Sequence, residues 1–270
     1  MLMLFAAKSA IAAGAEYIRF GTGKKTLIML PGLGDGLRTV KGTELPMALY
    51  YRSLAKDYTV YMISRKRVLQ SGCTTRDMAR DLKAVMEELG IVKASFLGVS
   101  MGGMIAQHFA AEYPESVEKL ILVATCARPN PILLESLAEW VTCAKENDHT
   151  ALMDSNIRRI YSESYYRKNR WLIPLVGKLT KPKSYDRFLL MAEACRSHDA
   201  WEQLPSIAAP TLVMGGGQDL ALGGEASREI AARIPGAVLK IYSQYGHSLY
   251  EEYKDFLQTV MEFLKIDQLK

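Results

Sequence analysis

Hydrophobic residues follow two different periods along this chain. Six short aliphatic runs are each bounded by glycine, proline or polar residues, at 26–32, 58–64, 94–100, 119–125, 210–216 and 237–243. Such runs are typical of strands buried on both faces of a parallel sheet. Between them, helical spacing of apolar residues predicts helices over 74–90, 102–113, 225–234 and 251–264. The alternation predicts an α/β fold with a doubly wound, mostly parallel sheet.

The helix predicted over 74–90 has signals at both ends. Thr74 followed by Asp77 three residues later forms a candidate N-cap, and Gly90 is a candidate C-cap.

The alternation stops between residues 127 and 205. No strand-like run occurs there, and tyrosine, tryptophan, arginine and methionine accumulate in helical patterns that four prolines divide into three or four helices. We therefore expect a core formed by residues 1–126 and 206–270, with a helical cap inserted at 127–205.

Composition narrows the class of protein. The chain has 270 residues, 49% of them apolar and 23% charged, which is the balance of a globular domain. A net charge of +5 gives no support for nucleic-acid binding. Cys73, Cys126, Cys143 and Cys195 lie far apart without metal-ligand spacing, so we expect free thiols in a reducing compartment and no metal site.

The N-terminal stretch "MLMLFAAKSAIAAGAEY" is apolar enough to raise the question of a targeting segment. Lys8 interrupts its apolar run and no basic region precedes it, which argues against a secretory signal. No run approaches 18 apolar residues, so no membrane span is expected, and the sequence favours a cytoplasmic protein.

The segment Gly98-Val99-Ser100-Met101-Gly102 lies between a predicted strand and a predicted helix. One interpretation is a tight turn. The other is a nucleophile elbow, in which a strained bend exposes the serine hydroxyl at the carboxyl edge of the sheet, beside a helix N-terminus. Glycines at 98 and 102 would leave room for that crowded bend. The setting favours Ser100 as a nucleophile.

A serine hydroxyl needs a general base, and the base needs a group that orients it. His247 follows the last predicted strand and therefore emerges at the carboxyl edge, where ligands bind in such sheets. His108 lies on the helix behind the serine, while His149 and His198 belong to the insertion. His247 is the predicted base.

The orienting carboxylate should come from another loop on the same edge. Asp219 follows the strand at 210–216 and fits the chain order Ser, Asp, His, although a turn aspartate would look the same. Asp199 is the second choice, and Asp35 is interpreted as a turn former. For the developing oxyanion, the predicted donors are the N–H of Met101 and, from the glycine-rich "LPGLGDG", the N–H of Leu33.

These segments together resemble the serine-dependent α/β-hydrolases, the family of esterases, lipases, lactonases, thioesterases and peptidases. The similarity covers roughly residues 15–125 and 205–265, in "LPGLGDG", "LGVSMGG", "YPESVEKLILVAT", "APTLVMGGGQD" and "GH". It implies the triad Ser100, Asp219 and His247. Pro31 stands where many members have histidine, and "SRKRVLQSG" (64–72) departs from the usual loop.

The insertion would then cover the active site. We expect aromatic side chains to wall the substrate pocket, with Met191 beside them: Trp140, Tyr161, Tyr165, Tyr166 and Trp171. The same residues could instead pack the cap onto the core. Between positions 156 and 187, nine basic residues face two acidic ones. This surplus is either a solvated helix face or a surface for an acidic acyl carrier such as coenzyme A or an acyl carrier protein.

The sequence thus predicts a cofactor-independent hydrolase of a small-molecule acyl substrate, an ester, thioester or related bond, acting through an acyl-enzyme. Two alternatives stay open. The chain could use the same triad for perhydrolase or lyase chemistry, or it could be a ligand-binding receptor on this fold with little turnover.

Overall fold

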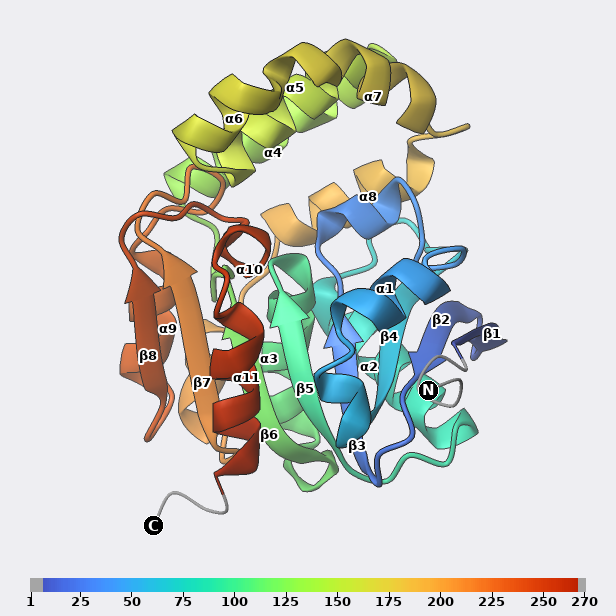
Figure 1. The fold of residues 1–270 in the computed structure, drawn as a ribbon, viewed down its shortest axis with the longest axis vertical. Helices are drawn as coiled ribbons and strands as arrows, with labels where there is room; N and C mark the ends of the chain where they lie inside the picture. Colours follow the sequence, from blue (N-terminus) through green and yellow to red (C-terminus); the bar gives the residue numbers. More distant parts are fainter. Residues whose placement is uncertain (1–6, 267–270) are drawn as a thin grey trace.

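An eight-stranded sheet forms the centre of the protein (Figure 1). The computed structural model describes residues 7–266, and the first six residues of the N-terminal apolar stretch lie outside that range. The strand order is β1-β2-β4-β3-β5-β6-β7-β8. The strands are β1 (Lys8–Ala12), β2 (Ala15–Phe20), β3 (Lys25–Leu30), β4 (Tyr58–Lys66), β5 (Ala94–Val99), β6 (Val117–Val123), β7 (Thr211–Gly216) and β8 (Val238–Tyr242).

Strands β3 to β8 pair in parallel, and only β1 and β2 run antiparallel to their neighbours. The predicted α/β class and mostly parallel sheet are therefore confirmed. The sequence did not reveal the β1–β2 hairpin, because four of the five residues of β1 are exposed and no buried aliphatic run marks this edge strand.

Helices cover both faces of the sheet (Figure 1). One face carries α2 (Thr75–Glu88), α3 (Met101–Glu112) and α9 (Ala226–Arg233), whose apolar residues form the larger core. The other carries α1 (Glu44–Tyr50) and α11 (Phe256–Lys265), which bury Ala48, Phe256, Val260 and Phe263. Because both faces are covered, the central strands read as continuous aliphatic runs.

Thr74 and Asp77 form the capping box at the start of α2, and Gly90 has a φ of +66° just beyond its end, as expected. The helix predicted over 251–264 is instead divided into α10 (Leu249–Glu252) and α11, since Tyr253 has an extended backbone. The periodicity missed this break.

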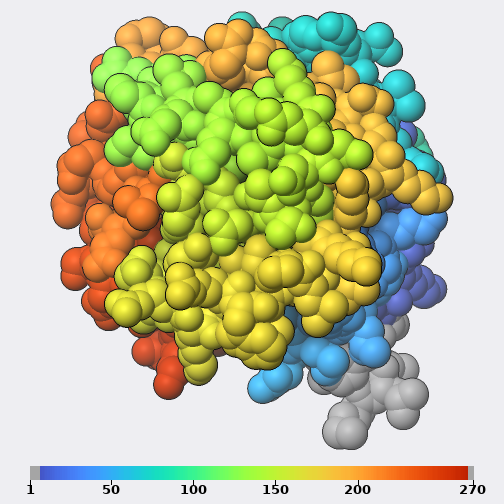
Figure 2. Space-filling model, turned by 90° about the horizontal axis from the view of Figure 1, so that it is seen from above, coloured from blue at the N-terminus to red at the C-terminus, as the bar shows by residue number. Residues whose placement is uncertain are grey.

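Residues 131–196 form five α-helices that lie over the carboxyl edge of the sheet (Figure 1). They are α4 (Pro131–Lys145), α5 (His149–Ile160), α6 (Glu163–Asn169), α7 (Ile173–Thr180) and α8 (Asp186–Arg196). Seen from above, α4 to α7 cover the middle of the molecule, and α1 emerges beside them (Figure 2). Between residues 7 and 266, no helix is long and apolar enough to cross a bilayer.

Candidate active site

Ser100 lies in a sharp bend between β5 and α3. Its backbone has φ 53° and ψ −121°, a conformation that non-glycine residues rarely adopt and that is retained where the surrounding structure enforces it. A Cβ on Gly102 would lie 2.0 Å from the Leu30 oxygen, and one on Gly98 would lie 2.6 Å from the Gly102 oxygen. Glycine is therefore required at both positions. A sharp strand-to-helix bend with a strained serine between two glycines is the geometry of a nucleophile elbow.

His247 and Asp219 lie side by side at the same edge of the sheet. His247 Nδ1 is 2.8 Å from Asp219 Oδ2, and each residue is 5% exposed. The other carboxylate oxygen of Asp219 accepts hydrogen bonds from the backbone N–H groups of Ala221 and Leu222, at 2.8 and 2.9 Å. The loop thus holds the carboxylate with one oxygen facing the imidazole. His247 and Ser100 line the same cavity of about 280 Å³.

The other three histidines have different partners. His108 Nδ1 lies 2.7 Å from Gln203 Oε1, and His149 Nε2 lies 3.1 Å from Thr180 Oγ1. His198 Nδ1 lies 2.8 Å from Thr75 Oγ1, and burial lowers its pKa to about 3. None of the three lines the cavity of Ser100.

Asp199, the second choice for the orienting carboxylate, accepts a hydrogen bond from the backbone N–H of Trp201 and so caps a short turn. Asp35 is not simply a turn former. It is 4% exposed, and its carboxylate accepts hydrogen bonds from the Arg65 backbone N–H at 3.0 Å and from Arg187 at 2.5 Å.

Arg65 links this carboxylate to the glycine-rich loop. The loop passes directly against Ser100, since a Cβ on Gly32 would lie 3.2 Å from Ser100 Cβ. Arg65 Nη2 donates hydrogen bonds to the Pro31 oxygen and, at 3.3 Å, to the Gly32 oxygen. The Gly32 carbonyl belongs to the same peptide group as the Leu33 N–H. Burial lowers the pKa of the guanidinium from its usual value, and the neighbouring Asp35 opposes that shift.

Arg187 brings helix α8 of the cap into the same network. Its guanidinium donates hydrogen bonds to the Asp35 carbonyl and carboxylate and to the carbonyls of Arg65 and Lys66. Sequence reasoning missed the network of Asp35, Arg65 and Arg187. The signal available was the unusual basic stretch at 64–72, which directly follows an apolar strand.

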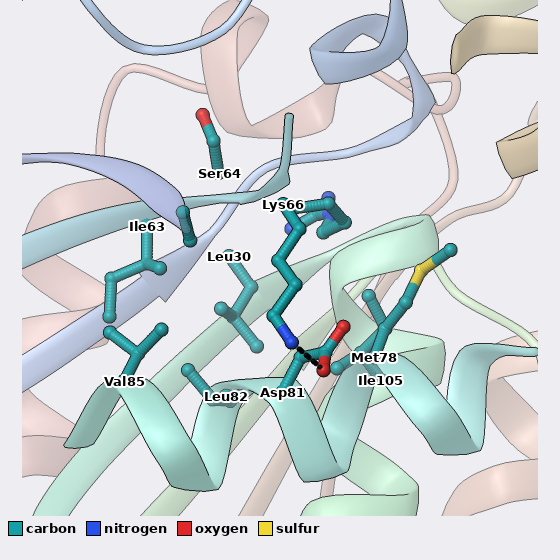
Figure 3. A pocket seen from close by; sticks show the side chains of 11 residues that line it. Leu30, Ile63, Ser64, Lys66, Met78, Asp81, Leu82, Val85 and Ile105 are labelled. Atoms are coloured by element: carbon teal, nitrogen blue, oxygen red, sulfur yellow. Dashed lines mark hydrogen bonds and ion pairs between the residues drawn. The ribbon is translucent and has the colours of Figure 1, made fainter. Parts of the chain in front are cut away.

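A small cavity lies below the end of β4 (Figure 3). Lys66 borders it and pairs with Asp81 of α2, with the nitrogen and oxygen 2.6 Å apart. Its volume of about 20 Å³ leaves room for roughly one water molecule. This cavity is a packing gap rather than a substrate site.

The aromatic residues expected in the pocket divide into three groups. Trp140 lines the cavity of Ser100, and Tyr165 lines a second cavity that adjoins it. Tyr161 stacks on Tyr165 and donates a hydrogen bond to Glu251, while the Tyr166 hydroxyl binds Asp154. Trp171 is 73% exposed and lines neither cavity. Met191 is fully buried in the core.

The positive charge counted along residues 156–187 is partly neutralised in the folded protein by acidic side chains from other segments. Arg158 and Arg159 pair with Glu139 of α4, and Arg159 also pairs with Glu135. Arg187 is turned inward to Asp35. The remaining members form no ion pair within residues 7–266: Arg167, Lys168, Arg170, Lys178, Lys181 and Lys183.

Comparison with known proteins assigns the chain to a family. A model of the alpha/beta hydrolase fold matches residues 25–253. A 2-hydroxy-6-oxononadienedioate/2-hydroxy-6-oxononatrienedioate hydrolase of Klebsiella pneumoniae is 30% identical over 261 residues, which cover 90% of this chain and 88% of the relative.

Two solved structures share the fold. An alpha/beta hydrolase enzyme from a Medee basin deep-sea metagenome library has a TM-score of 0.81 and 24% identity, over 95% of this chain and 96% of the other. The enol-lactonase of Burkholderia xenovorans has a TM-score of 0.78 and 24% identity, over 95% and 99%. With a matching family model over most of its length and the strand order described above, the chain belongs to the α/β-hydrolase family and is a hydrolase.

Proposed function

We propose that this hydrolase cleaves a carboxylic ester, thioester or related acyl bond through Ser100, His247 and Asp219. The observation that carries the proposal is the juxtaposition at one edge of the sheet. A serine in a strained bend shares a cavity with a histidine whose far nitrogen is held by a buried carboxylate. This combination supplies a nucleophile, a base and an orienting group.

The reaction follows from these positions. Ser100 Oγ attacks the carbonyl carbon while His247 Nε2 takes its proton, and the imidazolium then protonates the leaving group as the bond to it breaks. Water attacks the resulting acyl-enzyme, His247 removes a proton from that water, and the acid is released as Ser100 recovers its proton. Asp219 holds Nδ1 of the imidazole, which leaves Nε2 for the exchange of protons with the serine.

The oxyanion is assigned to two backbone donors. Met101 is the first residue of α3 and Leu33 the first of the short 3-10 helix Leu33–Gly36, so neither N–H has an acceptor within its own helix. The close approach of Gly32 to Ser100 supports a position beside the reacting carbonyl for this loop. Such donors stabilise the charge that develops in the transition state.

The class of reaction is tested with a fluorophosphonate serine probe and a substrate panel. We expect stoichiometric labelling of Ser100 and turnover of aryl esters, with thioesters, lactones and a 2-hydroxy-6-oxo dioate tested in parallel. Labelling without turnover of any acyl substrate would favour a receptor. Perhydrolysis in peroxide, or cleavage without uptake of water, would favour the other chemistries of this triad.

Arg65 is expected to act as a positioning residue for the oxyanion donor. Its charge-assisted hydrogen bond to the Gly32 oxygen orients and polarises the peptide group that carries the Leu33 N–H. Replacing Arg65 by methionine should lower kcat by ~10- to 100-fold with little change in KM, because the affected donor acts in the transition state.

The control for Arg65→Met is its effect on two kinds of ligand. Affinity for a trifluoromethyl ketone, which forms the oxyanion, should fall together with kcat. Affinity for a non-reactive ground-state analogue should stay the same, and Arg65→Lys should recover part of the loss. Equal weakening of both ligands would mean that Arg65 only supports the fold.

We also propose that the unpaired basic residues of the cap attract an acidic acyl carrier, coenzyme A or an acyl carrier protein. Arg167, Lys168 and Arg170 lie on or just after α6 and form no ion pair within the described chain, in contrast to Arg158 and Arg159. A group of like charges raises the encounter rate of an oppositely charged partner over a Debye length of about 8–10 Å.

Changing Arg167, Lys168 and Arg170 to glutamate should therefore lower kcat/KM for a carrier-linked thioester, with a loss that disappears at high salt. Hydrolysis of a neutral aryl ester should remain within about twofold, since a neutral substrate gains nothing from the field. The matched control is the ion-paired Arg158→Glu. Equal effects on both substrates, or none, would identify a solvated surface.

A further inference from the structure

Two cavities adjoin beside Ser100, on either side of Gly32. The first, here called the cap cavity, contains Ser100 and His247 and is walled by Trp140, Leu152 and Phe188. The second, the α1 chamber, has a volume of about 800 Å³ and extends between α1, the ends of β3 and β5, and α10. Pro31, Gly32 and Tyr250 line both. The reacting carbonyl therefore lies at a junction from which a substrate can extend in two directions.

The position of the histidine decides which half of the substrate goes where. His247 must deliver a proton to the leaving group, so the leaving group has to lie beside the imidazole. His247 lines the cap cavity and is not a lining residue of the α1 chamber. The leaving group consequently belongs in the cap cavity. The acyl group, which points away from it across the carbonyl carbon, is directed past Gly32 into the α1 chamber.

The walls of the α1 chamber indicate the chemistry of the group that fills it. Six of its lining residues are aliphatic: Met29, Leu30, Met47, Met62, Leu97 and Val99. Four tyrosines add apolar ring surface, and two of them, Tyr50 and Tyr165, are 43% and 38% exposed, so the chamber reaches the surface between α1 and α6. Figure 2 shows α1 beside the cap helices. A chamber of this size and lining suits a large apolar group.

The charged residues of the two cavities narrow the class of substrate further. The acidic residues that line the α1 chamber are Glu251 and Glu252. In the cap cavity, the lining includes one carboxylate, that of Asp35, together with the imidazole of His247. Glu252 accepts hydrogen bonds from the Ser162 backbone and hydroxyl, which hold it in place. Neither lining includes a lysine or arginine within residues 7–266. A carboxylate that enters either cavity would lose hydration without gaining a cationic partner.

We infer that the parts of the substrate inside the two cavities are uncharged, and that a bulky apolar acyl group occupies the α1 chamber; the phosphates of an acyl carrier would lie outside both cavities. This inference rests on the proposed acyl transfer at Ser100. It separates the chain from the Klebsiella pneumoniae relative of 30% identity, which is a hydrolase of a dioate. A fatty or aryl acyl ester, thioester or lactone is the class that the two cavities fit.

The acyl assignment is tested by filling each cavity in turn. Met47→Trp, on the wall of the α1 chamber, should lower the ratio of kcat/KM for p-nitrophenyl octanoate to that for the acetate by at least ~10-fold, a typical effect of lost pocket space. Met153→Trp, on the wall of the cap cavity, should leave this acyl ratio within twofold. It should instead lower the ratio of bulky to small leaving groups. The opposite pattern would reverse the assignment.

The charge assignment uses two acyl groups of equal length. Wild-type protein should hydrolyse p-nitrophenyl hexanoate at least ~100-fold more efficiently than the mono-p-nitrophenyl ester of adipic acid, whose acyl chain ends in a carboxylate. Met47→Lys should raise the adipate-to-hexanoate ratio several-fold, because it adds a cation to the wall. Equal hydrolysis of both esters by wild type, or no change in the ratio with Met47→Lys, would overturn the inference.

Failure of the inference can be distinguished from failure of the proposed function. Suppose that fluorophosphonate labels Ser100 and esters are turned over, but Met47→Trp leaves the octanoate-to-acetate ratio unchanged and Met47→Lys leaves the adipate-to-hexanoate ratio unchanged. The acyl group then does not occupy the α1 chamber. If Ser100 is not labelled and no ester is cleaved, the acyl-transfer mechanism itself is wrong. Labelling of Met47→Trp and Met47→Lys at the wild-type rate by a small fluorophosphonate would show that both variants keep the active site intact.

Discussion

Ser100→Ala should abolish fluorophosphonate labelling and lower kcat by at least ~10³-fold, because Ser100 is the serine that lines the cavity of His247 within residues 7–266. Alanine keeps the Cβ and places no new atom in the bend, so the melting temperature should stay within a few degrees. Intact-mass spectrometry after probe treatment and initial rates on an aryl ester measure the two effects.

The matched control for the nucleophile is Ser197→Ala. Ser197 is exposed on the cap, and its hydroxyl binds the Glu193 carbonyl. This variant should be labelled and should turn over substrate as the wild type does. Retention of more than a few per cent of activity by Ser100→Ala, with a folded protein, would remove Ser100 from the mechanism.

Asp219→Asn should lower kcat by ~10³- to 10⁴-fold while KM changes little, since an amide cannot hold the imidazole in the reactive tautomer or stabilise the imidazolium. Ala221 and Leu222 donate to one oxygen of this side chain, so the asparagine can keep those contacts and the loop should remain in place. Steady-state kinetics on an ester, with far-UV circular dichroism to check folding, provide the measurement.

Asp199→Asn is the paired comparison. Asp199 accepts a hydrogen bond from Trp201 in a short turn, and an asparagine oxygen can accept the same bond. We expect activity within about threefold of wild type, as for other surface substitutions of this kind. If Asp199→Asn caused the greater loss, the orienting carboxylate would have to be reassigned.

Much of the fold could be predicted because the pattern of this chain is local. Strands buried on both faces must be aliphatic throughout, so β3 to β7 are visible as runs, and Thr74 with Asp77 marks the start of α2. The β1–β2 hairpin was missed because an exposed edge strand needs no such run. The break at Tyr253 was missed because apolar residues on both sides continue the helical spacing.

The candidate site shows the same division. Ser100, Asp219 and His247 could be proposed from sequence because each follows a recognisable strand, and strand ends share one edge. The network of Asp35, Arg65 and Arg187 could not, because it joins side chains separated by 30 and 122 residues. Contacts between residues so far apart in the sequence depend on tertiary packing. For the same reason, the surplus of positive charge counted along residues 156–187 ignored the glutamates of α4.

The anchoring of α8 by Arg187 has a consequence for chimeric proteins made by exchanging caps. Helix α8 lies in the inserted segment, yet its Arg187 donates hydrogen bonds to Asp35 in the loop that carries Leu33. The packing is also close, since a Cβ on Gly36 of that loop would lie 2.7 Å from Phe188 Cα. A graft that replaced residues 127–205 as a block would therefore remove part of the support of this loop, to which the oxyanion donor Leu33 is proposed to belong. We expect functional chimeras to require a junction after Thr180, so that foreign helices replace α4 to α7 and the native α8 stays with the core.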